Sequence, residues 1–373
     1  MGKKILITST DLMMVQFLVP HVKNLSENGY EVEIACSDVG GRVDEIRQKL
    51  DGYIKEFHIV DLVRSPFSLG NLKGYRQMKQ IIKNGGYDIV WTNEPVMGIV
   101  TRLAARKHRK NGLKVMYMAH GFHFYKGAPL INWMLYYPVE KIMSSKTDLL
   151  VTVNKEDYAR SQKMRAKKVE YIHGIGIDTS RLENAEENSN IREELGLGED
   201  EFIIVSVGEL NENKNHKVII KALAKLNDKN VHYVICGKGD KLDELTSLAK
   251  ELAVDENVHF LGYRKDIAGI LKKSDVFAMP SYREGLPVST LEAMLCGLPV
   301  LSSKIRGLVD VMEDDVSGYM YSPNDADGFA DGLAKLRSDP DLRSKMGARN
   351  IETVKPFCIE ETKVQIENFL NEF

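Results

Sequence analysis

Two carboxylates stand eight positions apart in the segment YREGLPVSTLEAMLCGLPV, at Glu284 and Glu292. Ionised carboxylates accept strong hydrogen bonds, so such a pair could bind a ligand that is rich in hydroxyl groups. The apolar run before the segment predicts a buried strand, and Pro287 suits the first turn of a helix, where its missing N–H is not needed. We expect Glu284 in a tight loop after the strand and Glu292 about two turns into the helix.

A second polar loop, VGELNENKNH, follows the apolar run that ends at Gly208. A helix is expected to begin between Lys214 and His216, where a cation and unpaired backbone N–H groups could together hold a phosphate. Open parallel sheets bind ligands at the carboxyl ends of their strands, so both loops are expected at one edge. Each charged residue taken alone fits a solvated surface position better, and only the combination favours a binding site.

The elements that must position these loops are those of an α/β protein with parallel sheets, because apolar, β-branched runs alternate with helix-period segments. About six strands are expected in each half of the chain. The polar segment 178–190 lacks apolar periodicity and predicts the domain junction. We expect two Rossmann-like domains, residues 1–178 and 179–356, that face each other across a deep cleft, with a helix at about 357–373 packed back on the first.

The composition is ordinary for a globular chain, since 43% of the 373 residues are hydrophobic and 28% are charged. No apolar run approaches the length of a membrane span, and the first residues lead into a strand without a signal-peptide pattern. Four cysteines stand far apart without metal-ligand spacing, which predicts reduced core thiols and a cytoplasmic protein. They are Cys36, Cys236, Cys296 and Cys358.

Charge is distributed unevenly along the chain. Residues 1–178 hold 27 Lys and Arg against 18 Asp and Glu, a balance of +9, and the remainder holds 24 against 35, a balance of −11. A basic half can attract phosphates or an anionic membrane surface. Two independently soluble domains explain the asymmetry equally well.

Two other nucleotide-binding classes lack their motifs. The turn after the first strand, STDLMMVQF, contains no glycine, so the dinucleotide fingerprint of a dehydrogenase is missing. No P-loop motif occurs either. The G-x-G of CGKGD is a weak signal that is typical of a tight turn between a strand and a helix.

These motifs resemble the retaining nucleotide-sugar glycosyltransferases of family 4, which have the GT-B fold of two facing Rossmann-like domains. The segment 283–300 resembles that family's E-x7-E region, and VGELNENKNH, CGKGD, VHFLGYRKDI and SGYMY occur in the family's order. This resemblance covers essentially the C-terminal half. In the N-terminal half, AHGFHFYKGAPLINWMLYYPVEK and VTVNKEDY resemble the subgroup that builds capsular, exopolysaccharide and lipid-linked glycans.

The resemblance implies a nucleotide-sugar site in the C-terminal domain and an acceptor site in the N-terminal domain. Glu292 would hold the ribose hydroxyls, Glu284 would contact the donor sugar, and Lys214 would balance the charge of the leaving diphosphate. His120, at the end of KVMYMAH, resembles the family's active-site histidine, although a strand-end histidine is often structural. The other implied donor residues are Gly285, Leu286, Val288, Ser289, Gly208, Glu209, Tyr263 and Arg264, and those on the acceptor side are Phe122, His123, Phe124 and Lys126.

The chain departs from the family at Glu209, where the motif G-R-x-x-x-x-K usually has arginine. A carboxylate cannot cradle a diphosphate. Either Lys214 acts with another cation, for which Arg283 and Arg306 are candidates, or this loop has a rearranged role. The first loop also lacks the family's Gly-Gly turn, which puts contacts from that loop in question.

An aromatic segment points to the acceptor. Six aromatic side chains lie within 16 residues, near the basic run RKHRK at 106–110, and aromatics beside cations suit a membrane interface. They are Phe122, Phe124, Tyr125, Trp133, Tyr136 and Tyr137. The alternative is that they pack a helix onto the sheet. The leading hypothesis is a polyprenyl-diphosphate-linked saccharide acceptor, reached by peripheral contact with the inner face of an anionic plasma membrane.

The expected reaction is transfer from a nucleotide sugar, UDP-hexose or UDP-N-acetylhexosamine, with retention by same-face attack. We expect no cofactor and no metal, because Lys214 and helix N-termini can take a metal's place and no convincing D-x-D ends a strand. We expect no nucleic-acid partner. Two rivals remain: a nucleotide-sugar epimerase of the same fold, and a non-catalytic nucleotide-sugar-binding protein.

Overall fold

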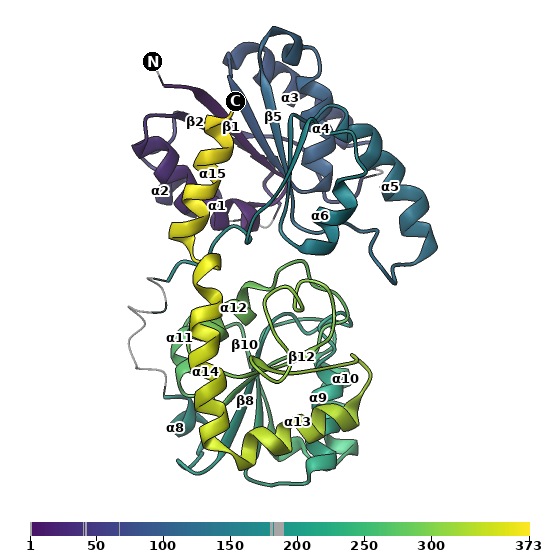
Figure 1. Cartoon of the computed structure of the whole chain (residues 1–373), viewed down its shortest axis with the longest axis vertical. Coiled ribbons are helices and arrows are strands. Elements are labelled where there is room, and N and C mark those ends of the chain that lie inside the picture. The colour runs from purple at the N-terminus through teal and green to yellow at the C-terminus, as the bar shows by residue number, and fades with distance from the viewer. Residues whose placement is uncertain (1, 40, 42, 67, 180–181, 183–189) are drawn as a thin grey trace. The chain divides into compact units, whose positions relative to one another are not determined.

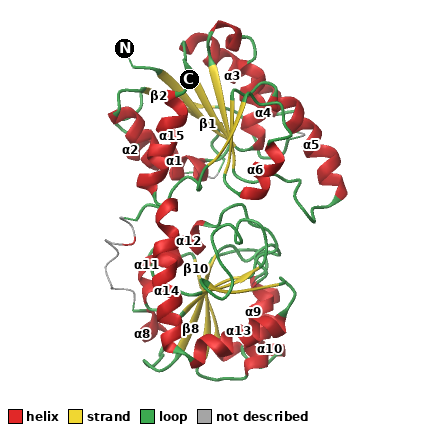
Figure 2. Cartoon of the chain, in the orientation of Figure 1, coloured by secondary structure: helices red, strands yellow, loops and turns green. Residues whose placement is uncertain are grey.

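The computed structural model divides the chain into two compact units (Figure 1). The N-terminal unit comprises Met1–Gly176 with Ile359–Phe373, and the C-terminal unit comprises Ile177–Cys358. The structure describes residues 2–39, 41, 43–66, 68–179, 182 and 190–373. Each unit has a parallel sheet with helices on both faces (Figure 2), so the predicted α/β class with two Rossmann-like domains is confirmed. Most of the predicted junction, 178–190, lies outside the described residues.

A seven-stranded sheet forms the N-terminal unit, in the order β3-β2-β1-β4-β5-β6-β7. The sequence predicted six of these strands and missed β3. That strand lies at the edge of the sheet, and none of its residues is buried, so it has no apolar run. The strands are β1 Lys4–Ser9, β2 Glu31–Cys36, β3 Glu56–Ile59, β4 Ile89–Asn93, β5 Lys114–Ala119, β6 Leu149–Thr152 and β7 Lys168–Tyr171.

A six-stranded sheet forms the C-terminal unit, in the order β10-β9-β8-β11-β12-β13. Two clusters of buried side chains cover its two faces. One lies beneath α9 (His216–Leu226), α10 (Leu242–Glu251) and α13 (Ala326–Ser338), and the other lies beneath α11 (Ile267–Lys272), α12 (Val288–Leu295) and α14 (Pro340–Val354). The strands are β8 Phe202–Val207, β9 Val231–Cys236, β10 Val258–Gly262, β11 Val276–Met279, β12 Val300–Ser303 and β13 Gly318–Tyr321.

In both sheets the strand order reverses once. The reversal falls between β1 and β4 in the N-terminal unit and between β8 and β11 in the C-terminal unit. At such a point the loops after two neighbouring strands diverge to opposite faces and leave a crevice in which α/β proteins bind ligands. The loops that follow these four strands are therefore where each unit is expected to hold a ligand.

The helices cover both sheets. In the N-terminal unit they are α1 Leu12–Glu27, α2 Val43–Lys49, α3 Asn71–Gly85, α4 Pro95–Ala105, the 3-10 turn η1 His108–Asn111, α5 Leu130–Ser144, α6 Lys155–Ser161 and α15 Ile359–Asn371. In the C-terminal unit they are α8 Ile191–Leu195, α9 His216–Leu226, α10 Leu242–Glu251, η2 Asp255–Asn257, α11 Ile267–Lys272, α12 Val288–Leu295, α13 Ala326–Ser338, α14 Pro340–Val354 and η3 Lys355–Phe357.

The last helix, α15, belongs to the N-terminal unit and packs beside α1 (Figure 1). Glu367 accepts hydrogen bonds from Asn24 of α1 and from Asn28, the C-cap of α1, and Glu372 forms an ion pair with Lys168 of β7. Backbones approach closely at Gly176, because a Cβ there would lie 2.6 Å from the Cα of Ile359. Within the part of the chain that the structure describes, no helix has both the length and the apolar character needed to cross a bilayer.

Candidate active site

The loop between β8 and α9 is hydrogen-bonded to the residue that follows β11. Asn215 adopts a left-handed conformation, with φ of 54°, and is buried immediately before α9. Its amide Nδ2 donates to the carbonyl oxygens of Pro280, at 2.9 Å, and Pro323, at 2.7 Å. The start of α9 is therefore fixed beside the loop that follows β11.

An ion pair joins these two loops. Lys214 Nζ lies 2.8 Å from Glu284 Oε1, and both side chains are largely buried. The backbones are joined as well: Tyr282 N donates to Asn213 O at 2.8 Å, and Asn213 Nδ2 donates to Arg283 O at 3.0 Å. The structure thus brings together two of the residues that the sequence predicted for catalysis, at the point where the strand order reverses.

Glycines let the chain pass close to Lys214. A Cβ at Gly208 would lie 3.1 Å from the Cε of Lys214, and a Cβ at Gly237 would lie 1.8 Å from the carbonyl oxygen of Gly208. Real Cβ atoms do not approach that closely, so only glycine fits at position 237, where the chain leaves β9 against the backbone of Gly208. The glycines of CGKGD therefore permit close packing against the loop that follows β8.

A buried hydrogen-bond network supports the start of α9. His216 Nδ1 lies 2.8 Å from the hydroxyl oxygen of Tyr233, which lies 2.8 Å from Ser206 Oγ, and Ser206 Oγ donates to Ala278 O at 2.6 Å. His216 Nε2 lies 3.2 Å from the carbonyl oxygen of Glu209. Burial lowers the pKa of His216 to about 4, so its ring is neutral near pH 7. This network links β8, β9 and β11 to the first residue of α9.

Glu292 lies on α12, which begins at Val288 with Pro287 as its N-cap. The helix therefore starts one residue after Pro287, and the half-buried Glu292 stands about one turn from its start, not two. No side chain caps this helix, so first-turn N–H groups at Val288 and Ser289 face the same loop as Glu284. Gly285 and Leu286 are half-buried in that loop.

Gly307 packs against the backbone of this loop, and the sequence did not predict its role. Its φ is 81°, and a Cβ would lie 2.4 Å from the carbonyl oxygen of Gly285. A non-glycine residue would be strained and would displace the loop. The available signal was a glycine four residues after β12, in IRGL. Two cations were proposed to compensate for Glu209. Arg306, which precedes Gly307, is half-buried, and Arg283, which precedes Glu284, is exposed.

The remaining donor-side predictions lie at different places. Glu209 is exposed, and its Oε2 accepts from Asn211 Nδ2 at 2.9 Å within the same loop. Tyr263 is 58% exposed after the edge strand β10. Arg264 pairs with Asp266 at 2.7 Å and Glu194 at 2.8 Å, which raises its pKa. Its charge is therefore already balanced within the structure.

The corresponding loops of the N-terminal unit are joined by a carboxylate that the sequence reading missed. Glu94 follows β4 with φ of 62° and ψ of 156°, unusual backbone angles for a residue other than glycine. Its Oε2 accepts from the backbone N–H groups of Thr10, at 2.7 Å, and Asp11, at 3.1 Å, and from the Ser9 hydroxyl. Burial nevertheless raises its pKa. The available signal was an acidic residue at a strand end, in WTNEP.

His120 lies one strand further along the same edge. Its Nε2 is 3.0 Å from Asn93 Oδ1, and Asn93 Nδ2 donates to Thr8 O at 3.2 Å. Burial lowers the pKa of His120 to about 4, so the ring is neutral. Because the Asn93 oxygen must accept, Nε2 carries the proton and Nδ1 keeps a lone pair. His120 can thus accept a hydrogen bond through Nδ1.

A cavity of about 670 Å³ opens beside His120, within the size range of ligand pockets. Its polar lining includes Thr10, Glu94 and His120, and its other walls come from the start of α4, the loop 121–124 and α5. Glu140 of α5 also lines it and is held by the fully buried Arg102, with oxygen to nitrogen distances of 3.0 and 3.2 Å.

The aromatic segment packs mainly inside the unit. Phe122 and Phe124 are buried and stacked, with ring centroids 4.7 Å apart, and Phe124 contacts Trp133 and Tyr137 of α5. The packing alternative therefore describes these two phenylalanines, although both also reach the cavity wall. His123 stacks on Tyr136 and lines the cavity, whereas Lys126 is exposed.

Comparisons with known proteins agree with this organisation. The family model of glycosyl transferases group 1 matches residues 187–353, and that of glycosyl transferase 4-like proteins matches residues 5–154. The EpsD protein of Bacillus subtilis (strain 168), whose name describes a glycosyltransferase, is 38% identical over 97% of this chain and 94% of its own length.

Two further proteins are informative. The Escherichia coli UDP-Gal:alpha-D-GlcNAc-diphosphoundecaprenol alpha-1,3-galactosyltransferase is 28% identical over 84% of this chain and 82% of its own. A crystal structure of Anabaena HepE in complex with UDP and glucose superposes over 100% of both chains, with a TM-score of 0.82 at 20% identity. The second likeness supports the fold alone.

Proposed function

Because this chain belongs to the family-4 glycosyltransferases of the GT-B fold, we propose that it transfers a hexose or N-acetylhexosamine from a UDP-sugar to a lipid-linked saccharide, with retention. The observation that carries the proposal is the Lys214–Glu284 pair at the strand-order reversal of the C-terminal unit. The donor and acceptor classes named for the Escherichia coli relative support the choice of substrates.

In the proposed donor complex, the resting ion pair exchanges partners. The Lys214 ammonium turns to the diphosphate, and Glu284 accepts hydrogen bonds from hydroxyl groups of the donor sugar. Glu292, on the first turns of α12, accepts from the ribose hydroxyls, and the uncapped N–H groups of Val288 and Ser289 donate to phosphate oxygens. Gly285 and Gly307 let the backbone approach the ligand.

Bond cleavage needs charge stabilisation more than acid catalysis. A nucleoside diphosphate is already a good leaving group, and its negative charge grows as the glycosyl bond breaks. Lys214 opposes that charge in a largely buried position, where electrostatic contacts are strong. The acceptor hydroxyl attacks from the face that the diphosphate leaves, and a diphosphate oxygen takes its proton. We propose that neither a metal nor a cofactor is required.

The acceptor is assigned to the N-terminal unit because of the neutral histidine and the cavity beside it. His120 Nδ1 can accept a hydrogen bond from a sugar hydroxyl without first losing a proton. A lipid-linked acceptor also requires contact with a membrane. The exposed apolar side chains of α5 support this, because the helix leaves six of them at least 39% exposed. They are Leu130, Ile131, Met134, Leu135, Val139 and Ile142.

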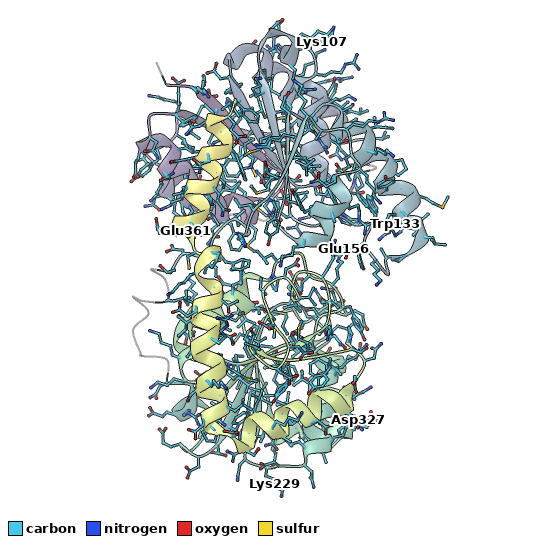
Figure 3. The ribbon with its side chains drawn as sticks, in the orientation of Figure 1. Lys107, Trp133, Glu156, Lys229, Asp327 and Glu361 are labelled. Carbon is cyan, nitrogen blue, oxygen red and sulfur yellow. The ribbon has the colours of Figure 1, made fainter. Side chains whose placement is uncertain are left out.

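Cations border this helix at its C-terminal end. Arg109 Nη1 donates to Ser145 O at 3.3 Å, so the basic run 106–110 lies where α5 ends. Lys107 of this run lies well apart from Trp133, which is near the start of α5 (Figure 3). Arg109 also pairs with Asp148 at 2.8 Å, which leaves Arg106, Lys107 and Lys110 as exposed cations of the run. An apolar helix with cations at its end suits peripheral binding to an anionic bilayer.

The test incubates the full chain with UDP-galactose, UDP-glucose, UDP-N-acetylglucosamine or UDP-N-acetylgalactosamine and GlcNAc-diphosphoundecaprenol. Mass spectrometry should show one sugar added to the lipid, and NMR of the product should show the anomeric configuration of the donor. Release of an epimerised sugar, or tight UDP-sugar binding with no transfer to this or related lipid-linked saccharides, would overturn the proposal. An excess of EDTA should leave the rate unchanged.

A further inference from the structure

The cavity beside His120 has both polar and apolar lining. Thr10, Glu94 and His120 contribute polar groups, and Met134, Leu135 and Val139 of α5 contribute apolar side chains. Those three apolar side chains are also 72%, 41% and 39% exposed. The apolar side chains that α5 contributes to the lining therefore also belong to its exposed apolar face.

The carboxylates of the cavity are already held by the protein. Glu94 accepts from two backbone N–H groups and one hydroxyl, and Glu140 accepts from the guanidinium of Arg102 and the hydroxyl of Tyr117. The charge of Glu140 is therefore balanced by a guanidinium, whereas the groups that donate to Glu94 are neutral. The guanidinium of Arg64 also lines the wall, is 66% exposed and pairs with Asp11, so it would bind an anionic group by exchange of that partner.

Prolines and two branched side chains complete the apolar wall. Pro66, Pro95 and Pro138 line the cavity together with Val96 and Ile99 of α4. Proline has a fixed φ and no N–H, so these positions present rigid surface without a backbone donor. Such a wall favours a hydrocarbon chain over a polar saccharide, which would leave its hydroxyl groups without partners.

We infer that this cavity binds the first isoprene units of the acceptor's lipid, with the diphosphate at Arg64 and the saccharide toward His120. The inference rests on the proposed function and deepens it, because it names the part of the acceptor that the enzyme recognises. The lipid enters from the exposed face of α5, so a chain that leaves the bilayer there stays in contact with apolar surface. Each methylene that is removed from water adds to affinity.

The test compares acceptors that share GlcNAc-diphosphate and differ in the tail: methyl, geranyl and saturated decyl. We expect kcat/KM to be at least about tenfold higher with geranyl than with methyl, since burial of a few carbon atoms suffices for that factor. The geranyl acceptor should also exceed the decyl acceptor, because the rigid wall fits a branched chain. Ile99→Trp fills the cavity and should reduce the geranyl-to-methyl ratio to near one.

Leu72→Trp is the matched control, because Leu72 lies on α3, is 58% exposed and is absent from the cavity wall. It should keep the wild-type ratio. Val139→Trp is a second filling variant on the exposed side of α5, for use if Ile99→Trp does not fold. Titration calorimetry on the wild-type chain gives an independent reading: geranyl diphosphate should bind at least about tenfold more tightly than inorganic diphosphate.

The outcomes separate the two proposals. Transfer at equal kcat/KM to the methyl and geranyl acceptors would overturn the lipid site and leave the proposed function standing. Equal rates with geranyl and decyl would show that any alkyl chain fits and would overturn the isoprenoid assignment. No transfer to any of the three, nor to the undecaprenyl acceptor, would overturn the proposed function itself.

Discussion

The two units use the same topological position in different ways. In both, the loops after the two strands that flank the strand-order reversal are joined by a glutamate. In the C-terminal unit Glu284 pairs with the ammonium of Lys214, a side chain that can turn to a ligand. In the N-terminal unit Glu94 accepts from backbone N–H groups, which cannot move away without unfolding the start of α1.

The C-terminal site therefore contains a charged side chain that can change partners, whereas the glutamate of the N-terminal site is held in one arrangement by the backbone. The C-terminal site has a cation, an uncapped helix and glycines that open the backbone, which suits a diphosphate. The N-terminal site has a neutral histidine, satisfied carboxylates and an apolar wall, which suits an acceptor that is bound by shape and burial. Mutations should therefore affect turnover in the first unit and stability or acceptor selectivity in the second.

The largest effect should come from breaking the buried network of the N-terminal unit. Arg102→Met keeps the apolar stem but leaves the Glu140 carboxylate without its cation in the interior, and loss of one partner of a buried pair costs about 3–5 kcal/mol. Urea denaturation, with hydrogen exchange at β4 and β5, measures the loss. Arg264→Met, which breaks partly exposed pairs in the other unit, should cost about 1 kcal/mol or less. Equal losses of unfolding free energy in Arg102→Met and Arg264→Met would contradict this contrast between the two units.

Lys214→Ala should affect turnover more than donor binding. The ammonium opposes charge that grows as the diphosphate leaves, and removal of one such contact costs about 2.7–4 kcal/mol in the transition state. Steady-state kinetics should show kcat reduced about 10²–10³-fold with a smaller change in the donor KM. Lys217→Ala, which removes a lysine paired with Glu212 near the start of the same helix, is the control. A harmless Lys214→Ala would mean that Glu209 marks a different phosphate site.

The two glutamates of the C-terminal unit should differ in their kinetic effect. Glu292→Ala removes the acceptor of the ribose hydroxyls, and a hydrogen bond to a charged group contributes about 1.5–3 kcal/mol, so the donor KM should rise. Glu284→Ala should mainly lower kcat. Wild-type values of both constants in both variants would show that this segment is not the donor site.

The smallest effect per residue concerns the membrane. The full chain should sediment with anionic vesicles at low salt and be released as salt rises, because screening shortens the reach of surface charge. Neutralising Arg106, Lys107 and Lys110 together should weaken binding by about 1 kcal/mol per charge. Arg109 is kept, because its pair with Asp148 is structural. Wild-type protein that stays in the supernatant with excess anionic lipid would favour a soluble acceptor.

The charge asymmetry of the sequence is smaller in the folded units. The basic half has a balance of +9 up to residue 178, but the segment Ile359–Phe373, which carries four glutamates and one lysine, joins the N-terminal unit. That unit then holds 28 Lys and Arg against 21 Asp and Glu, a balance of +7. Membrane attraction should therefore depend on the local cations at the end of α5 more than on the net charge of the unit.

Much of the C-terminal unit was predictable, because its signals are local. The strand β11 is a continuous apolar run and β8 is a nearly continuous one, and the glycines and prolines that follow β11 mark the loop and the start of α12. Lys214 and Glu284 both follow predicted strands, so the rule for open parallel sheets placed them at one edge. The edge strand β3 was missed because its residues are not buried and show no apolar run.

The sequence by itself determined the fold class, the family and the order of the donor motifs, since these depend on short-range patterns of apolar, glycine and charged residues. Only the tertiary structure decided which side chains meet. Glu94 reaches Thr10 and Asp11 across 83 or more positions of sequence, and Arg102 reaches Glu140 across 38. Such contacts are set by strand order and helix packing, so no local pattern can report whether a charged residue is solvated, paired or lining a cavity.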